Sequence, residues 1–179
     1  MTPTDSELIT RALATDDRAA FGELVRRHQS AVRRFLRHLA GDAALADDLA
    51  QDTFLQAYRS LAKFRGEGTF STWLLGIAHN HWRNAMRRRR LEPLENVPEA
   101  PDESAPSPAR SAALRQDLSA ALAQLSAEEQ SVLHLSYQQG LSHSEVSTVL
   151  NAPIGTVKTH LARGKEKLRH LLTTWNPLT

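Results

Sequence analysis

Residues 70–90 contain the side-chain types that bind unpaired nucleic-acid bases. The segment FSTWLLGIAHNHWRNAMRRRR combines aromatic and amide side chains with five arginines and no acidic residue. Unstacked bases bind to flat side chains and amides, and the phosphates that accompany them need positive charge nearby. Nothing in residues 72–90 forbids a continuous helix, which Ser71 or Thr72 could cap. The segment therefore predicts a helical surface for single-stranded nucleic acid.

At about 3.6 residues per turn, this helix divides into a packing side and a reading side. The packing side contains Leu74, Ala78, Trp82, Ala85 and Met86. The reading side contains Trp73, Ile77, Asn80, Asn84 and Arg87. Each tryptophan taken singly is more typical of a core, and a basic run at a helix end also complements the helix dipole. Four consecutive arginines repel one another, however, which favours an anionic partner for the segment as a whole.

The composition sets broad limits on structure and location. A chain of 179 residues with 41% hydrophobic residues can form one domain or two small ones. It has no cysteine, which excludes disulfides and cysteine-ligated zinc. No apolar run approaches the roughly 20 residues that span a bilayer, and the polar N-terminus MTPTDSELI does not resemble a signal peptide. We expect a cytoplasmic protein without membrane insertion.

The positive charge is concentrated in two places. A formal net charge of +2 does not by itself indicate nucleic-acid binding. Residues 1–92 carry 15 Lys and Arg against 11 Asp and Glu, residues 93–150 carry 2 against 8, and residues 151–179 carry 5 against 1. The basic segments 83–90 and 158–169 therefore stand out from a balanced or acidic chain.

A proline-rich segment separates two helical blocks. Five of the eight prolines lie within residues 93–112, among Glu, Ser and Ala. This composition is typical of an extended, solvated linker. No segment on either side shows a sustained alternating strand pattern. The sequence therefore predicts an all-α protein with two small helical domains, residues 1–92 and 113–179, joined by a flexible linker.

Capping signals define helices in the first block. Thr4 with Glu7 forms a capping box, Asp16 or Asp17 can cap a second helix, and Gly41 ends that helix. Asp42 can begin a third helix. Its expected apolar face contains Leu45, Leu49, Phe54, Leu55 and Tyr58. The segment KFRGEGTF then interrupts the helical pattern.

The second block predicts a helix-turn-helix. Ser126 with Glu129 caps a helix that ends near Gly140, and Ser142 with Glu145 caps a short helix that ends at 151–153. A longer basic helix is expected from Thr156. A short helix, a tight turn and a second basic helix are typical of this DNA-binding motif. The residues expected on or near its outer face, toward a major groove, are Thr156, Lys158, Thr159, His160 and Arg163.

Two segments resemble a known family in order and spacing. ADDLAQDTFLQAYRSLAKFRGEGTFSTWLLGIAHN and LSYQQGLSHSEVSTVLNAPIGTVKTHLARGKEKLR are similar to the second and fourth domains of extracytoplasmic-function (ECF) bacterial sigma factors. The resemblance implies a sigma factor that binds core RNA polymerase through its clamp coiled coil and flap, directs it to promoter DNA and promotes melting. It also implies an anti-sigma factor as a partner.

The resemblance assigns site residues in three groups. Contacts to core polymerase are implied for Asp47, Asp48, Gln51 and Asp52, for which a solvated acidic helix face is the alternative. Contacts to the minus-ten element are implied for Phe64, Arg65, Phe70, Ser71, Trp73, His79, Asn80, Arg83, Arg87 and Arg88. Contacts to the minus-thirty-five element are implied for Ser142, Ser144, Thr156, Lys158, Thr159, His160 and Arg163. His79 and His160 stand where arginine is frequent, and Asn151 replaces a common glycine.

Parts of the sequence also fit two other classes of protein. The second block also resembles the helix-turn-helix of LuxR-type regulators, but residues 1–92 lack the hydrophobic strands of a receiver domain. The carboxylates and eight histidines suggest a metal-dependent nuclease. His79 and His81 would point about 200° apart on a helix, however, and no phosphate loop or nucleophile motif is present. We expect no catalytic activity, no metal and no cofactor.

Overall fold

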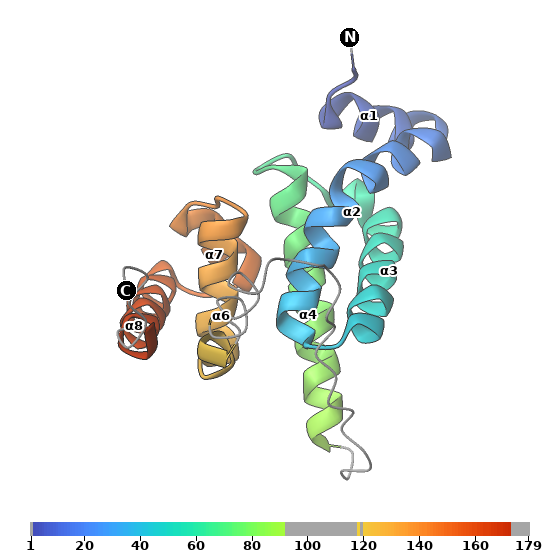
Figure 1. The fold of residues 1–179 in the computed structure, drawn as a ribbon. Helices are drawn as coiled ribbons and strands as arrows, with labels where there is room; N and C mark the ends of the chain where they lie inside the picture. Colours follow the sequence, from blue (N-terminus) through green and yellow to red (C-terminus); the bar gives the residue numbers. More distant parts are fainter. Residues whose placement is uncertain (1, 92–117, 119, 173–179) are drawn as a thin grey trace, which may run out of the picture. The chain divides into compact units, whose positions relative to one another are not determined.

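The computed structural model describes residues 2–91, 118 and 120–172, and each regular element within them is helical (Figure 1). This confirms the all-α class. The chain divides into two compact units, the first formed mainly by residues before 102 and the second mainly by those after. The expected linker, residues 93–112, lies outside the described residues, as do residues 113–117. In the described ranges, no helix is both long enough and apolar enough to cross a membrane.

The first unit is built around three packed helices. It contains α1 (Asp5–Thr15), α2 (Arg18–Ala40), α3 (Ala43–Ser60), the 3₁₀ turn η1 (Leu61–Lys63) and α4 (Phe70–Leu91). Helices α2, α3 and α4 pack against one another, and α1 packs against α2. Leu24, Phe35 and Leu36 of α2 are fully buried, as are Ala46 of α3 and Leu74 of α4. This core fixes which sides of α3 and α4 face outward.

Local capping chemistry explains the helix ends of this unit. The Thr4–Glu7 capping box forms as expected, and Asp17, rather than Asp16, caps α2. Gly41 ends α2 in the left-handed conformation at φ 65°, and the Asp42 carboxylate accepts a hydrogen bond from the Leu45 amide at 3.0 Å. These predicted boundaries are confirmed.

The expected cap of α4 was wrong. The helix begins at Phe70, and the Thr69 hydroxyl oxygen accepts a hydrogen bond from the Thr72 amide at 3.1 Å. The Trp73 amide donates to the Thr69 carbonyl at 3.2 Å. Threonine at 69 therefore caps the helix ahead of Ser71 and Thr72, and this places Phe70 in the first helical turn.

The second unit contains a helix-turn-helix. Residues 120–123 are helical, and the elements that follow are α6 (Ala127–Leu133), a π-helical turn η2 (His134–Gln138), α7 (His143–Leu150) and α8 (Ile154–Leu172). The sequence did not predict the π-helical turn that follows α6. Helices α6 and α8 approach closely, because a Cβ placed on Gly164 would lie 2.9 Å from Leu133 Cδ1.

The turn between α7 and α8 is tighter than expected. The Ser142–Glu145 cap forms, with the Ser142 amide donating to Glu145 Oε2 at 2.8 Å. Asn151 follows α7 in the left-handed conformation at φ 49°, which asparagine tolerates. Helix α8 begins at Ile154, two residues before the expected start, because the Val157 amide already donates to the Pro153 carbonyl at 3.1 Å.

Candidate nucleic-acid and polymerase interfaces

One side of α4 is anchored in the core of the first unit. Leu74 and Ala78 are inaccessible, and Trp82 is 8% exposed. The Trp82 indole nitrogen donates a hydrogen bond to the Leu39 carbonyl at 3.2 Å. The predicted packing side is thereby confirmed for these three residues, while Ala85 and Met86 are half-buried.

The opposite side of α4 presents amides and arginines to solvent. The exposed residues are Asn80, Arg83, Asn84, Arg87 and Arg88. Beside them lies a recess of about 310 Å³, to which α4 contributes Trp73, Ile77, Asn80, His81 and Asn84. Helix α3 and η1 contribute Gln56, Ser60 and Lys63. The sequence did not reveal these last three residues as part of the site, because helical periodicity relates residues of one helix only.

An aromatic cluster joins the loop before α4 to the helix itself. The ring centroids of Phe64, Phe70 and Trp73 lie 5.4–5.8 Å apart. Phe70 is 3% exposed, and its ring meets the His28 ring edge to face at 5.3 Å. His28 Nε2 lies 2.6 Å from a carboxylate oxygen of Asp5 on α1. The cluster therefore fixes the position of the loop relative to α1, α2 and α4.

Two residues expected to contact DNA directly lie inside the protein. Phe70 is part of the buried cluster, and His79 is 7% exposed with its ring 5.6 Å from that of Trp82. Direct contact between either side chain and DNA is therefore not available in this conformation. Phe64, Ser71 and Trp73 are half-buried and Arg65 is exposed, so these four side chains have surface available.

The acidic residues of α3 fall into two groups. The Asp47 carboxylate lies 3.5 Å from Arg33 Nε and 3.4 Å from Arg37 Nη2 of α2. Asp48, Gln51 and Asp52 are exposed. In the part of the chain that the structure describes, neither Asp48 nor Asp52 forms an ion pair. Of the four predicted polymerase contacts, Asp47 is therefore paired with arginines of α2. The side chains of the other three are exposed to solvent.

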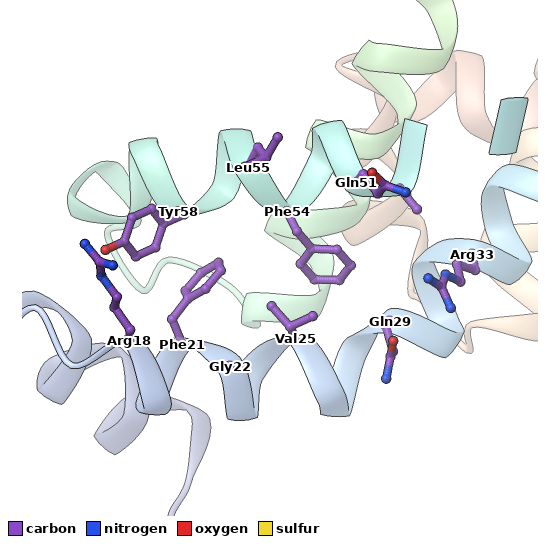
Figure 2. A pocket seen from close by; sticks show the side chains of 11 residues that line it. Arg18, Phe21, Gly22, Val25, Gln29, Arg33, Gln51, Phe54, Leu55 and Tyr58 are labelled. Carbon is purple, nitrogen blue, oxygen red and sulfur yellow. The ribbon is translucent and has the colours of Figure 1, made fainter. Parts of the chain in front are cut away.

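An apolar groove of about 600 Å³ lies between α2 and α3 next to these acidic residues (Figure 2). Phe54 and Tyr58 point from α3 toward Val25 and Phe21 of α2, and the rings of Phe21 and Tyr58 lie 5.0 Å apart. The Tyr58 hydroxyl donates to Asp16 at 2.6 Å, a hydrogen bond that raises the pKa of Tyr58.

The groove corrects the expected apolar face of α3. The core side of that helix consists of Ala46, Leu49, Ala50, Thr53, Ala57 and Ser60. Leu55 is 53% exposed and Tyr58 is 37% exposed. Apart from Leu49, small residues face the core, because α2 and α4 pack against α3 there, and Leu55 and Tyr58 lie on a second stripe. Two apolar stripes on one helix were the signal that could have revealed this surface.

The outer face of α8 lies where the sequence predicted it. Thr156, Lys158, Thr159 and Arg163 are exposed, and His160 is half-buried. Val157, Leu161 and Gly164 face inward. Ser142 and Ser144 are exposed at the start of α7, with their hydroxyls 3.0 Å apart. Ile154, which the sequence did not single out, is 45% exposed at the first position of α8.

Several basic residues of α8 already have partners within the second unit. Lys167 Nζ donates to Glu129 Oε2 at 2.8 Å, Lys165 Nζ lies 5.1 Å from the centre of the Tyr137 ring, and Arg169 pairs with Glu166. Lys158 and Arg163 form no ion pair within residues 120–172. Lys158 and Arg163 are therefore the two basic positions of the segment with neither an ion pair nor a ring contact among residues 120–172.

The ion pair with Lys167 also affects the protonation of Glu129. Burial of Glu129, whose side chain is 4% exposed, would raise its pKa. Hydrogen bonds from the Lys167 ammonium and the Ser126 amide outweigh burial, so the pKa is lowered. Glu129 therefore joins the cap of α6 to α8. No group of three or more His, Asp or Glu side chains that could hold a metal ion occurs among the described residues.

Comparisons with known proteins agree with this geometry. Residues 24–92 match sigma-70 region 2, and residues 115–168 match sigma-70 region 4. A helical unit with an amide- and arginine-bearing helix, followed by a helix-turn-helix unit, therefore defines a transcription initiation factor of the sigma-70 class.

Individual relatives indicate the family within the sigma-70 class. The RNA polymerase sigma-H factor of Pseudomonas aeruginosa is 33% identical over 92% of this chain and 91% of its own length. The ECF sigma factor SigE of Mycolicibacterium smegmatis is 36% identical over 89% of this chain, which spans 65% of SigE. The sigma factor RpoE of Bartonella quintana, in complex with the anti-sigma factor NepR, superimposes with a TM-score of 0.69 at 25% identity, covering 87% of this chain and 98% of RpoE.

The chain belongs to the ECF family of RNA polymerase sigma factors, the proteins that direct core RNA polymerase to promoters.

Proposed function

We propose that this chain directs core RNA polymerase to promoters by dividing the DNA contacts between α4 and α8, and that α3 carries the polymerase contact. The observation that supports this division best is the outer face of α4. Its exposed amides and arginines lie beside a recess that no acidic side chain lines. Such a face suits unpaired bases with their phosphates.

In the minus-ten element, Asn80 contacts base edges, and Phe64 and Trp73 offer their rings to unstacked bases. Arg65, Arg83, Arg87 and Arg88 contact the phosphates of that strand. Ser71 lies beside the captured base. Phe70 and His79 act as positioning residues, because both are buried and pack against the aromatic side chains that hold α4 and its preceding loop.

In the minus-thirty-five element, the exposed face of α8 enters the major groove. Lys158 and Arg163 carry the phosphate contacts, because their charges are not matched within the second unit as described. Base-edge contacts are proposed for Thr156, Thr159 and His160, and backbone contacts for Ser142 and Ser144 at the start of α7.

Core polymerase binds the outward side of α3. Asp48, Gln51 and Asp52 are exposed and suit a basic surface. Asp47 contributes by holding Arg33 and Arg37 beside the site rather than by direct contact.

Binding alone accounts for this activity. The free energy of binding unpaired bases drives strand opening. This chain therefore needs neither nucleotide hydrolysis nor a covalent step. We place the chain in the cytoplasm, where polymerase and promoter DNA meet. An anti-sigma factor is the proposed regulator, by analogy with RpoE of Bartonella quintana.

Run-off transcription with the full chain and core polymerase tests the proposal. The wild-type chain is expected to direct initiation at a subset of promoters in a library, with permanganate-reactive thymines in the minus-ten element. Replacing both Asp48 and Asp52 with asparagine should weaken polymerase binding, while Glu128→Gln, on an exposed residue of α6, should not. A wild-type chain that neither binds core polymerase nor supports initiation would refute the proposal.

A further inference from the structure

A threonine lies at the centre of the exposed face of α8. Val157 and Leu161, two residues before and two after Thr159, are buried. Residues two apart on a helix point about 200° away from each other. Thr159 therefore faces away from the core of the second unit, and its side chain is exposed.

The hydroxyl group of Thr159 is engaged within its own helix. It donates a hydrogen bond to the Gly155 carbonyl oxygen at 2.9 Å, one turn earlier in α8. A hydroxyl carries a single proton, so this one cannot donate to a base at the same time. The β-carbon carries one other heavy group, a methyl. Because a β-branched residue does not favour a helix more than serine would, α8 itself does not explain that methyl group.

The neighbouring side chains indicate which part of the DNA this methyl group meets. At about 100° per residue, Thr159 lies between Lys158 and Arg163 on the helix surface. Phosphates run along both edges of a major groove, and base edges form its floor. A residue between two cations that reach phosphates therefore faces the floor of the groove.

The exposed residue next to Thr159 on this face is small. Ala162 lies one turn further along α8, is exposed, and ends in a methyl group. Neither Ala162 nor the engaged hydroxyl of Thr159 can donate a hydrogen bond to a base. In the major groove, thymine is the base that presents an apolar group, its C5 methyl.

We propose that Thr159 recognises a thymine of the minus-thirty-five element through contact between its methyl group and the C5 methyl of the base. The inference rests on the proposed contact of α8 with that element, and it adds the base that the helix selects at this position. The element should accordingly contain an A·T pair opposite Thr159, with the thymine on either strand.

Deoxyuridine isolates the contact, because it pairs as thymidine does and lacks only the C5 methyl. Holoenzyme formed from the full chain and core polymerase first selects a promoter from a library. Each thymine of its minus-thirty-five element, on both strands, is then replaced in turn by deoxyuridine, and the affinity of the holoenzyme for each duplex is measured by fluorescence titration. At one position the replacement should weaken binding by about fourfold, the effect of removing one buried methyl group.

Three variants show whether Thr159 makes that contact. Thr159→Ser keeps the hydroxyl that bonds to Gly155 and removes the methyl group. It should bind the thymine duplex about fourfold more weakly than wild type, and deoxyuridine at that position should weaken it no further. Thr159→Val keeps a methyl group and should remain sensitive to deoxyuridine. Thr156→Ser removes a methyl group from another exposed threonine of α8 and is the matched control, which should also remain sensitive.

A selected element without thymine, or one in which no deoxyuridine weakens wild-type binding, would overturn the inference. It would also be overturned if Thr159→Ser stayed as sensitive to deoxyuridine as wild type, because another residue would then make the contact. Insensitivity of Thr159→Val would overturn it too, since the hydroxyl would then carry the contact. Holoenzyme that binds a scrambled minus-thirty-five element as tightly as the selected one would instead refute the proposed function of α8.

Discussion

Helices α4 and α8 both carry clustered basic residues, but they use them differently. In α8, Lys165, Lys167 and Arg169 interact with side chains of their own unit, so only part of the cluster is available to DNA. In α4, Arg83, Arg87 and Arg88 are exposed, and α4 itself has no acidic residue to neutralise them.

The difference shows that a count of basic residues does not measure the charge offered to a ligand. A helix that reads paired DNA needs a few phosphate contacts at fixed positions, and its other cations can serve the fold. A helix that binds a flexible single strand gains from every charge along its exposed side.

The largest expected effect concerns what holds α4 in place. Trp82→Ala removes a buried indole and its hydrogen bond to Leu39, and should destabilise the first unit by about 3–5 kcal/mol. Residue-resolved amide hydrogen exchange should show lost protection in α2 and α4, with α6 and α8 unchanged. Equal loss of protection in both units would contradict the separate roles of the two helices.

The next effect separates melting from initial binding. Asn80→Ala should reduce open-complex formation by roughly ten- to a hundredfold, because a base-edge contact contributes about 1–3 kcal/mol. Retention of the closed complex is expected, since the α8 contacts are intact. Permanganate footprinting follows melting, and gel shifts on double-stranded promoter follow initial binding. Normal melting by this variant would remove Asn80 from the reading face.

A smaller effect tests which cations of α8 face DNA. Lys158→Ala should lower the salt dependence of duplex binding by about one unit in the logarithmic slope. Lys165→Ala is the matched control, because Lys165 lies over the Tyr137 ring. Affinities measured across a series of salt concentrations give the slopes. Equal slopes for the two variants would show that Lys165 contacts DNA despite its contact with the Tyr137 ring.

The smallest effect concerns acid stability of the second unit. The pKa of Glu129 is lowered from 4.5, so an unfolded chain binds a proton there more readily than the folded one. The resulting stabilisation is present above pH 4.5 and disappears as the pH falls through the lower folded pKa. Amide hydrogen exchange in α6 and α8 of the full chain, measured over a series of urea concentrations, gives the stability of the second unit at each pH. This stability should show the loss. Glu129→Gln should remove it while keeping an acceptor for the cap, and an unchanged pH profile in that variant would refute the assignment.

Much of the fold follows from local signals in the sequence. The capping residues Thr4, Asp17 and Asp42, the stop at Gly41 and the left-handed Asn151 depend on a few neighbouring residues, and the structure has each of them. The buried side of α4 also follows from its periodicity.

Features that depend on contacts between helices could not be predicted in this way. The sequence placed Leu55 and Tyr58 on the packing side of α3. Small residues occupy most of that side instead, because α2 and α4 pack against it. It gave Phe70 and His79 surface roles, whereas neighbouring rings bury both. Gln56 and Lys63 line the recess only because α3 and η1 lie beside α4.

The contact of His28 with both Asp5 and Phe70 has a consequence for the first helix. Asp5 lies on α1, yet its carboxylate sets the orientation of the imidazole against which Phe70 packs. Truncation of the amino terminus before α2 would therefore loosen a loop about sixty residues away in sequence. Shortened versions of this protein should lose selectivity for unpaired bases before they lose affinity for the duplex.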